Sequence, residues 1–134
     1  MFSRMLDVIV PYSGTLGARI VELRPGQCRA TLKDRRSIRN HLRSVHAMAL
    51  ANLGELASGL ALMMLLPAGM RGIVTKFHIE YFKKARGLLT ATSEVSPLTS
   101  QEEQQLLVVA VITDEQGEIV AKTFAEWTIG PKNS

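Results

Sequence analysis

The segment 46–66 constrains the fold of this chain more than any other. It is rich in Ala, Leu and Met, which are strong helix formers, and it predicts one long helix. Ser44 is a reasonable N-cap, and Pro67 and Gly69 end the pattern. Apolar residues occur on every face of this helix, so we expect it to be buried rather than amphipathic.

Strand patterns lie on both sides of that helix. Before it, Ala18 to Leu23 and Gln27 to Leu32 flank a Pro25-Gly26 turn and predict a hairpin. After it, the pattern predicts strands at Gly72 to Phe82, Leu88 to Val95, Gln105 to Ile112 and Glu118 to Ile129. The last two are joined by a polar turn at Asp114 to Gly117 and form a second hairpin.

This order of elements predicts an α+β fold, in which one long antiparallel sheet wraps around a central helix. The 134 residues are expected to form one domain, 1–134. A short helix is also predicted at Phe2 to Val10, ended by Pro11. In the long strand, simple alternation places Thr75 on the same face as Ile73 and Phe77.

Composition excludes several classes of protein. A net charge of +4, spread along a chain with few aromatic residues, does not indicate a nucleic-acid surface. A single cysteine, Cys28, allows no disulfide within the chain and fits a reducing compartment. No signal peptide is recognisable, and the longest uncharged stretch, Leu56 to Met70, falls short of a membrane span. We therefore expect a cytoplasmic protein that binds neither nucleic acid nor membrane.

Three polar residues lie just before the apolar helix, at its start and in its first half: Asn40, His46 and Glu55. Burying an ionisable group is costly unless it is paired or used, so these residues are candidates for a functional site. His46 and Glu55 are nine residues apart, which is half a turn out of phase and about 13.5 Å along the helix. If both are functional, the site needs two copies of the helix, and hence a dimer.

The chemistry suggested by these groups is acyl transfer to water. Backbone N–H groups near His46 and Ala47 lack intrahelical acceptors and lie at the positive end of the helix dipole, where they can polarise a carbonyl. A carboxylate from a second chain could attack that carbonyl or activate water. Structural roles remain open for each residue: Glu55 could pair with an arginine, Asn40 could cap a turn, and His46 could have no role.

Other candidates stand outside the helix. Thr75 could make a local hydrogen bond or contact the site. The basic turn of Lys83, Lys84 and Arg86 could be simply solvated or could bind phosphate. The sequence has no metal-ligand spacing, no glycine-rich phosphate loop and no GxSxG motif, so no metal or cofactor is expected.

Together these motifs resemble the hotdog-fold thioesterases, particularly the phenylacetate-pathway type and its uncharacterised relatives. That family has an Asn, five residues, His-Gly-Gly, and an Asp or Glu nine residues after the His. Here Asn40, His46-Ala47-Met48 and Glu55 stand in that pattern, and Ile79 to Gly87 resembles a later Tyr/Phe-x-Arg-Pro-Ala-like turn. The similarity extends over roughly residues 14–129.

The resemblance implies a role for each matched position in the hydrolysis of an acyl-coenzyme A thioester. Glu55 would be the nucleophile or general base, and the Ala47 N–H would polarise the carbonyl. Asn40 would position the water or the carbonyl from the partner subunit, and His46 would orient the helix start. Thr75 would help to place the water. The coenzyme A phosphates would be held by Lys83, Lys84 and Arg86. The assembly implied is a homodimer, or a dimer of dimers.

Two departures from the family pattern affect the expected activity. Ala47-Met48 replaces Gly-Gly, which keeps the N–H but adds a methyl group and the Met48 side chain where substrate approaches. Lys83-Lys84 replaces Arg-Pro, so the turn is less rigid. The rival functions are therefore a non-catalytic protein that binds an acyl conjugate, a hotdog dehydratase, for which the spacing does not match, and a purely structural dimeric module.

Overall fold

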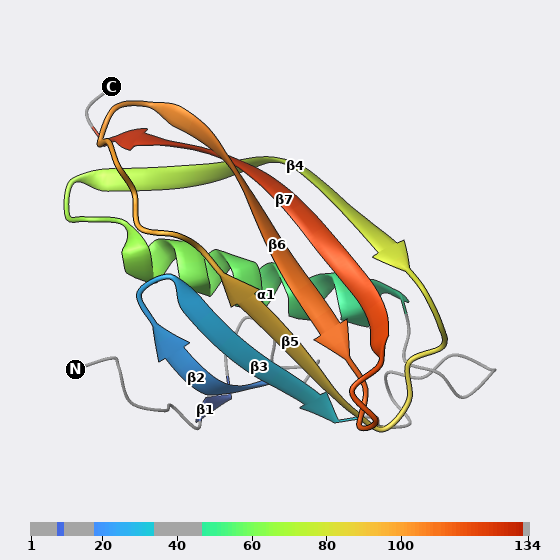
Figure 1. Ribbon diagram of the computed structural model, residues 1–134. Helices are drawn as coiled ribbons and strands as arrows, with labels where there is room; N and C mark the ends of the chain where they lie inside the picture. The colour runs from blue at the N-terminus through green and yellow to red at the C-terminus, as the bar shows by residue number, and fades with distance from the viewer. Residues whose placement is uncertain (1–7, 10–17, 34–46, 133–134) are drawn as a thin grey trace.

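The computed structural model describes residues 8–9, 18–33 and 47–132. In this part of the chain one helix lies against one face of a seven-stranded antiparallel sheet of order β1-β2-β3-β5-β6-β7-β4 (Figure 1). The elements are β1 Val8–Ile9, β2 Arg19–Arg24, β3 Gln27–Lys33, α1 Ala47–Leu65, β4 Met70–Tyr81, β5 Leu88–Glu94, β6 Gln104–Thr113 and β7 Ile119–Pro131. The predicted α+β class, the central helix and the two hairpins are confirmed.

Pro25 and Gly26 form the turn between β2 and β3, as the sequence predicted. Gly26 has φ +80°, which suits the third position of a type II turn, while Pro25 presets the second. The Gly26 N–H donates to the Ala61 carbonyl of α1 at 3.0 Å, and the Gly26 carbonyl accepts from the Val95 N–H at 2.6 Å. The turn is therefore fixed to the helix and to the end of β5.

The core lies between α1 and the face of the sheet that it covers. Leu53 and Leu62 of the helix are fully buried, as are Leu32, Leu89 and Ile112 of the sheet. Burial of a side chain of this size stabilises the fold by about 1.5–3 kcal/mol. The hydroxyl of the buried Ser58 donates to the Gly54 carbonyl at 2.9 Å, so this polar group has a partner in the core.

Cys28 is part of this core. Its thiol is free and buried, and desolvation, followed by the charge of Glu22, raises its pKa from 9.0 to about 12. The thiol therefore stays protonated at neutral pH, as expected for a structural cysteine rather than a reactive one.

The helix is not buried on every face within the chain, so that prediction was wrong. Met48 is 66% exposed and Met63 is 47% exposed, and they lie on one stripe of α1 with Asn52 and Glu55. The reason is geometric, because the sheet covers one side of the helix only. By length and composition α1 could also cross a membrane, with a mean hydropathy of 1.5 over its most apolar window, but core helices meet the same criterion.

The predicted helix at Phe2 to Val10 was also wrong where the structure describes it. Val8 and Ile9 form β1, which pairs with β2 through Val8 opposite Ile20 and Ile9 opposite Arg19. The β-branched side chains of Val8 and Ile9 favour an extended conformation, and β2 offers an edge to pair with.

β4 contains a β-bulge at Thr75, because the pairing with β7 shifts between Val74 and Lys76. The bulge moves Ile73 to the face turned away from α1, where its side chain is 57% exposed. The predicted set of Ile73, Thr75 and Phe77 on one face was therefore wrong. β4 is also the last strand of the sheet, so one of its edges is unpaired among the described strands.

Candidate functional site

Glu55 is the only charged residue in the 19 residues of α1. It is partly buried and lies on the open stripe of the helix, on the side turned away from the core. Its backbone carbonyl accepts a hydrogen bond from the Ser58 hydroxyl at 3.3 Å. An apolar helix thus presents one carboxylate on the face that its own sheet leaves uncovered.

The start of α1 is held by the end of β4. The Tyr81 hydroxyl donates to the Ala47 carbonyl at 3.3 Å, and burial raises the pKa of Tyr81. The first turn of α1 contains no acidic residue, so nothing within the helix offsets the positive end of its dipole. The helix start is therefore suited to polarise a carbonyl.

One chain does not bring these two groups together. Ala47 and Glu55 are eight residues apart on one helix, which corresponds to about 12 Å along its axis. Asn40 and His46, the other two members of the predicted constellation, lie outside the described residues. A site that uses both the helix start and Glu55 therefore needs a second copy of α1.

Thr75 makes the local hydrogen bond that was one of its two predicted roles. Its hydroxyl donates to the Glu126 carbonyl of β7 at 3.2 Å, across the bulge in β4. The hydroxyl is exposed on the edge strand. A contact between Thr75 and substrate stays a prediction.

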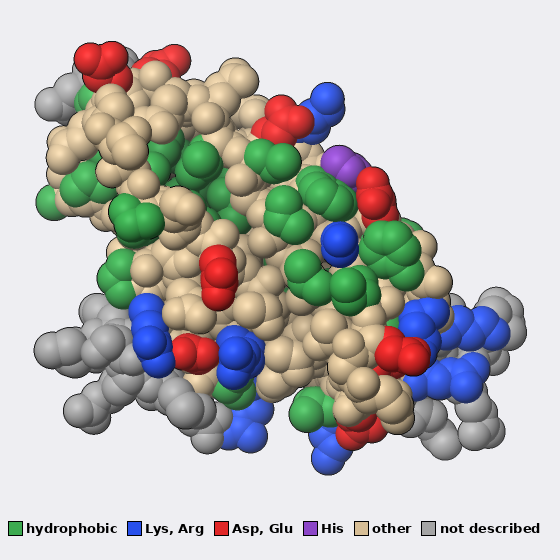
Figure 2. All heavy atoms as spheres, in the orientation of Figure 1, with side chains coloured by type: hydrophobic (Ala, Val, Ile, Leu, Met, Phe, Trp, Pro, Cys, Tyr) green, Lys and Arg blue, Asp and Glu red, His purple; other side chains and the backbone are tan. Residues whose placement is uncertain are grey.

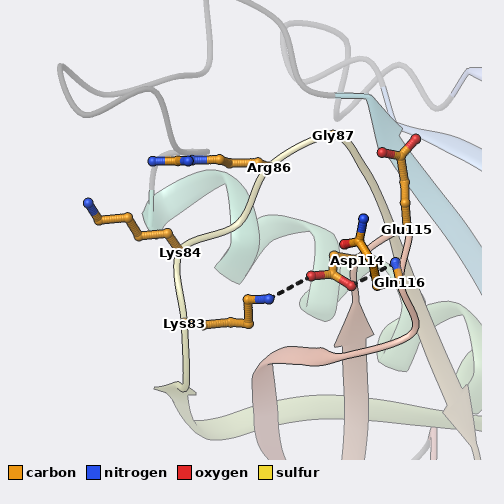
Figure 3. A pocket seen from close by; sticks show the side chains of 7 residues that line it. All are labelled: Lys83, Lys84, Arg86, Gly87, Asp114, Glu115 and Gln116. Atoms are coloured by element: carbon orange, nitrogen blue, oxygen red, sulfur yellow. Dashed lines mark hydrogen bonds and ion pairs between the residues drawn. The ribbon is translucent and has the colours of Figure 1, made fainter.

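The basic turn after β4 borders a surface depression of about 500 Å³. The lining residues are Lys83, Lys84, Arg86, Gly87, Asp114, Glu115 and Gln116, from this turn and from the β6–β7 turn. Figure 3 shows Lys83 pointing toward Asp114, whereas Lys84 and Arg86 extend away from it. Tyr81, which contacts the start of α1, is only two residues before Lys83, so the depression and the helix start are at the same end of the molecule.

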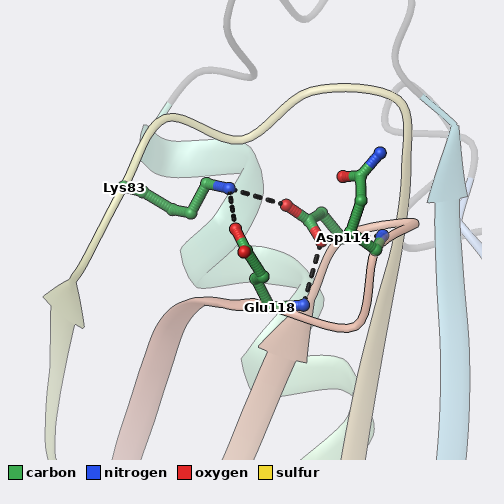
Figure 4. Close-up of polar contacts among 4 residues, drawn as sticks. Lys83, Asp114 and Glu118 are labelled. Carbon is green, nitrogen blue, oxygen red and sulfur yellow. Dashed lines mark hydrogen bonds and ion pairs between the residues drawn. The ribbon is translucent and has the colours of Figure 1, made fainter.

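Lys83 is paired with two carboxylates in this depression. Its ammonium group donates to Asp114 at 3.1 Å and to Glu118 (Figure 4). The hydrogen bonds to Glu118 and Asp114 raise the pKa of Lys83. Desolvation raises the pKa of Asp114, but hydrogen bonds from Lys83 and from the backbone of Glu118 and Gln116 outweigh it, and the pKa is lowered. The charge of Lys83 is thus offset, and less of it is available to a phosphate.

Two buried polar atoms near the helix were not predicted from the sequence. Thr123 Oγ1 and Trp127 Nε1 have no hydrogen-bond partner among the described residues. Both residues are on β7, on the face that packs toward α1. Because strand patterning shows which side chains point inward but not whether their polar atoms find partners, no signal in the sequence could have identified them.

Solved structures share this architecture. A protein from a structural-genomics project is 33% identical, with a TM-score of 0.83 over 90% of this chain and 82% of its own. A Pseudomonas aeruginosa protein of unknown function, described as a probable thioesterase, is 23% identical, with a TM-score of 0.81 over 91% and 88%. A thioesterase family protein from Silicibacter pomeroyi is 21% identical, with a TM-score of 0.77 over 91% and 90%.

These likenesses and the sheet order define the class of the protein, which is the hotdog fold that the sequence predicted. Within that class the chain belongs to the family described as a domain of unknown function (DUF4442). The model of that family matches residues 1–129 of the chain. None of the curated proteins matches the chain.

Proposed function

We propose that this protein hydrolyses acyl thioesters of coenzyme A. The observation that carries the proposal is the single carboxylate of α1, Glu55, on the stripe that the chain's own sheet leaves open. Glu55 either attacks the thioester carbonyl or takes a proton from a water that attacks it. In the first route the acyl group passes to the carboxylate as an anhydride, which water then hydrolyses; in the second route water adds directly to the carbonyl. In both routes the C–S bond breaks, the carboxylic acid is released, and the departing thiolate takes a proton from the water that is consumed.

The other groups come from a second copy. The Ala47 N–H polarises the carbonyl, Asn40 positions the carbonyl or the water, His46 orients the helix start and Thr75 helps to place the water. Pairing of β4 with β4 of a second copy would continue the sheet and bring the two helices together, because an unpaired strand edge is a template for another strand. The homodimer that results would carry two equivalent sites, and a cytoplasmic location stays a prediction.

The direct test is thiol release from a panel of short, medium and aromatic acyl-coenzyme A substrates. Turnover of at least one member, above the rate of spontaneous hydrolysis, is the expected result, and the preferred member identifies the acyl class. Failure of the folded wild-type protein to release thiol from any member would contradict hydrolysis.

The shared site makes a quantitative prediction for mixed variants. Glu55→Ala and Asn40→Ala should each be inactive alone. After the two are unfolded together and refolded, half of the dimers contain one of each, and one of the two sites in such a dimer is intact. The mixture should therefore recover about a quarter of wild-type activity. An inactive mixture, with heterodimers shown to form by mass spectrometry of tagged chains, would place Asn40 and Glu55 in the same chain's site.

Lys84 and Arg86 are the candidates for the coenzyme A phosphates whose side chains extend away from Asp114 (Figure 3). Reversal of both charges, Lys84→Glu with Arg86→Glu, should raise KM for acyl-coenzyme A about tenfold or more and leave kcat nearly unchanged. Hydrolysis of the matching acyl-pantetheine, which lacks the nucleotide, should not change.

The control for this pair is Lys132→Glu, at the opposite end of β4, where the Lys132 N–H donates to the Gly69 carbonyl. This variant should retain the wild-type KM. An equal rise in KM for the pantetheine substrate would mean that the double variant distorts the site rather than removing phosphate contacts.

One observation favours a second candidate, a non-catalytic protein that binds an acyl conjugate. Met48 is 66% exposed beside Ala47, at the helix start where the thioester carbonyl would approach. Calorimetric binding of an acyl-coenzyme A that is never cleaved would support this candidate. Turnover gained on Met48→Gly would show that the Met48 side chain prevents hydrolysis.

A further inference from the structure

Asn52 is the second polar side chain on the open stripe of α1, beside Glu55. The other residues of that stripe, Met48 and Met63, are apolar. The remaining polar side chain of the helix, Ser58, is buried and hydrogen-bonded within the helix. Residues three apart on a helix lie on the same face, so the Asn52 amide and the Glu55 carboxylate are neighbours. The proposed function uses Glu55 and leaves Asn52 without a role.

The amide of Asn52 is exposed, and the part of the chain that the structure describes gives it no hydrogen-bond partner. The face of the sheet turned away from α1 is different, because there charged side chains of both signs lie among the hydrophobic ones (Figure 2). One uncharged amide on an otherwise apolar stripe is typical of a contact between two helices in which a single polar residue fixes the alignment.

The proposed site determines where Asn52 lies in a pair of chains. The site brings the Ala47 N–H of one chain to Glu55 of the second, and two-fold symmetry repeats this contact in the opposite direction. Two antiparallel copies of α1 that meet in this way are related by an axis midway between residues 47 and 55, at Ala51. Asn52 is the next residue, so the two copies of Asn52 are offset by only about 3 Å along the helices.

We infer that Asn52 is a positioning residue of the proposed site. Its amide pairs with Asn52 of a second copy beside the two-fold axis, and this pair sets the register in which the start of one helix meets Glu55 of the other. The inference rests on the proposed function and adds to it the residue that aligns the two halves of the site.

A carboxamide is suited to pair with its own copy. Its oxygen accepts and its NH₂ group donates, so two copies can exchange reciprocal N–H···O hydrogen bonds. A charged side chain would repel its own equivalent at this position. Glu55 avoids such repulsion because the two copies of Glu55 are offset by about 12 Å along the helices.

The amide pair favours one register over the alternatives. A slip between the helices would leave two amides unpaired against apolar side chains, which is unfavourable. A slip of one turn would also move each helix start by about 5.4 Å relative to the opposite Glu55. The N–H that polarises the thioester carbonyl would then be out of reach of the carbonyl that Glu55 serves.

Cysteine cross-linking tests the register. Asn52→Cys places two thiols beside the axis, and mild oxidation should link most of the protein into dimers on a non-reducing gel. The reason is that facing Cα atoms of packed helices come within the roughly 4.4–6.8 Å that a disulfide requires. Cys28 does not interfere, since it is buried and its thiol stays protonated. The matched control is Met63→Cys, on the same stripe but about 36 Å from its equivalent, which should not be linked.

Asn52→Leu tests the consequence for the site. Leucine suits an apolar helix contact, so the dimer and the midpoint of urea unfolding should be retained. The value of kcat should fall about tenfold, because the helices are no longer held in one register. Met63→Leu, an apolar exchange of similar size on the same stripe, should keep the wild-type kcat. A purely structural role for Asn52 would give the opposite pattern, with lower stability and an unchanged kcat.

Three results would overturn the inference: a folded, dimeric Asn52→Cys that forms no cross-link, a Met63→Cys that is linked to the same extent, or a stable Asn52→Leu dimer with the wild-type kcat. The cross-link is read without substrate, so it is judged separately from hydrolysis. Cross-linking at residue 52 in a protein that releases no thiol would contradict the proposed hydrolysis and support the register.

Discussion

Glu55→Gln should lower kcat/KM for thioester hydrolysis by about three orders of magnitude or more. Glutamine keeps the size of the side chain but can neither attack a carbonyl nor accept a proton from water, so the loss measures the chemical role of the carboxylate. Spectrophotometric thiol release, compared with the wild-type protein on the preferred substrate, gives the ratio directly.

The control for this variant is Glu102→Gln, which makes the same change outside α1. Glu102 lies in an exposed turn, where its N–H donates to Ser100 Oγ at 3.0 Å. It should keep full activity. Circular dichroism of Glu55→Gln should match the wild-type spectrum, because glutamine and glutamate are similar in size and in helix propensity. Activity above about a tenth of wild type in a folded Glu55→Gln would contradict the proposed role.

Gly54→Ala should be strongly destabilising, with a loss of about 3 kcal/mol or more in the free energy of unfolding. A Cβ on Gly54 would lie within 3.0 Å of the Cβ, Cγ2 and Oγ1 atoms of Thr123. Thr123 is fully buried and β-branched, so it cannot rotate away cheaply. Urea unfolding followed by circular dichroism measures the difference.

Gly59→Ala is the matched control, because it makes the same change on the same helix. There a Cβ would be 3.7 Å from the Trp127 ring, an ordinary contact, and the substitution should stabilise α1 by about 0.5–1 kcal/mol. Thr123→Ala, combined with Gly54→Ala, should recover part of the loss, since Thr123 Oγ1 has no partner to lose among the described residues. Equal stability of the two alanine variants would show that α1 does not pack on β7 as closely as described.

The sequence predicted the elements whose signals are local. The helix is specified by a run of strong helix formers that ends at Pro67. The first hairpin is specified by Pro25, which fixes its own φ, and by Gly26, which adopts the positive φ that the turn requires. The predicted helix, 46–66, agrees with α1 to within a residue where the structure describes it. A single domain over 1–134 stays a prediction.

The features that were missed depend on contacts between distant segments. Alternation in β4 assumes an uninterrupted pleat, and the bulge at Thr75 is visible only in the register with β7. Val8 and Ile9 are extended because β2 is available to pair with them. The open stripe of α1 could not be inferred from its composition, because an apolar helix has the same sequence whether its own chain or another covers it.

The same limit applies to the candidate site. The position of Glu55 in an apolar helix was evident from the sequence, and the structure places it on the uncovered stripe. The partners of Lys83 were not evident, because Asp114 and Glu118 are 31 and 35 residues further along the chain. The roles of Asn40 and His46 rest on the family pattern alone, since both lie outside the described residues.

The turn at Gly26 joins three parts of the molecule that are far apart in sequence. Its N–H is bonded to Ala61 of α1, and its carbonyl is bonded to Val95 at the end of β5. Exposed amide hydrogens ordinarily exchange quickly with solvent. The amides of Gly26 and Val95 are both hydrogen-bonded at this turn, so they can exchange only when the hairpin separates from the helix and from β5. In deuterated buffer the amides of Gly26 and Val95 should therefore exchange together, and their common rate reports the opening of the hairpin from the core.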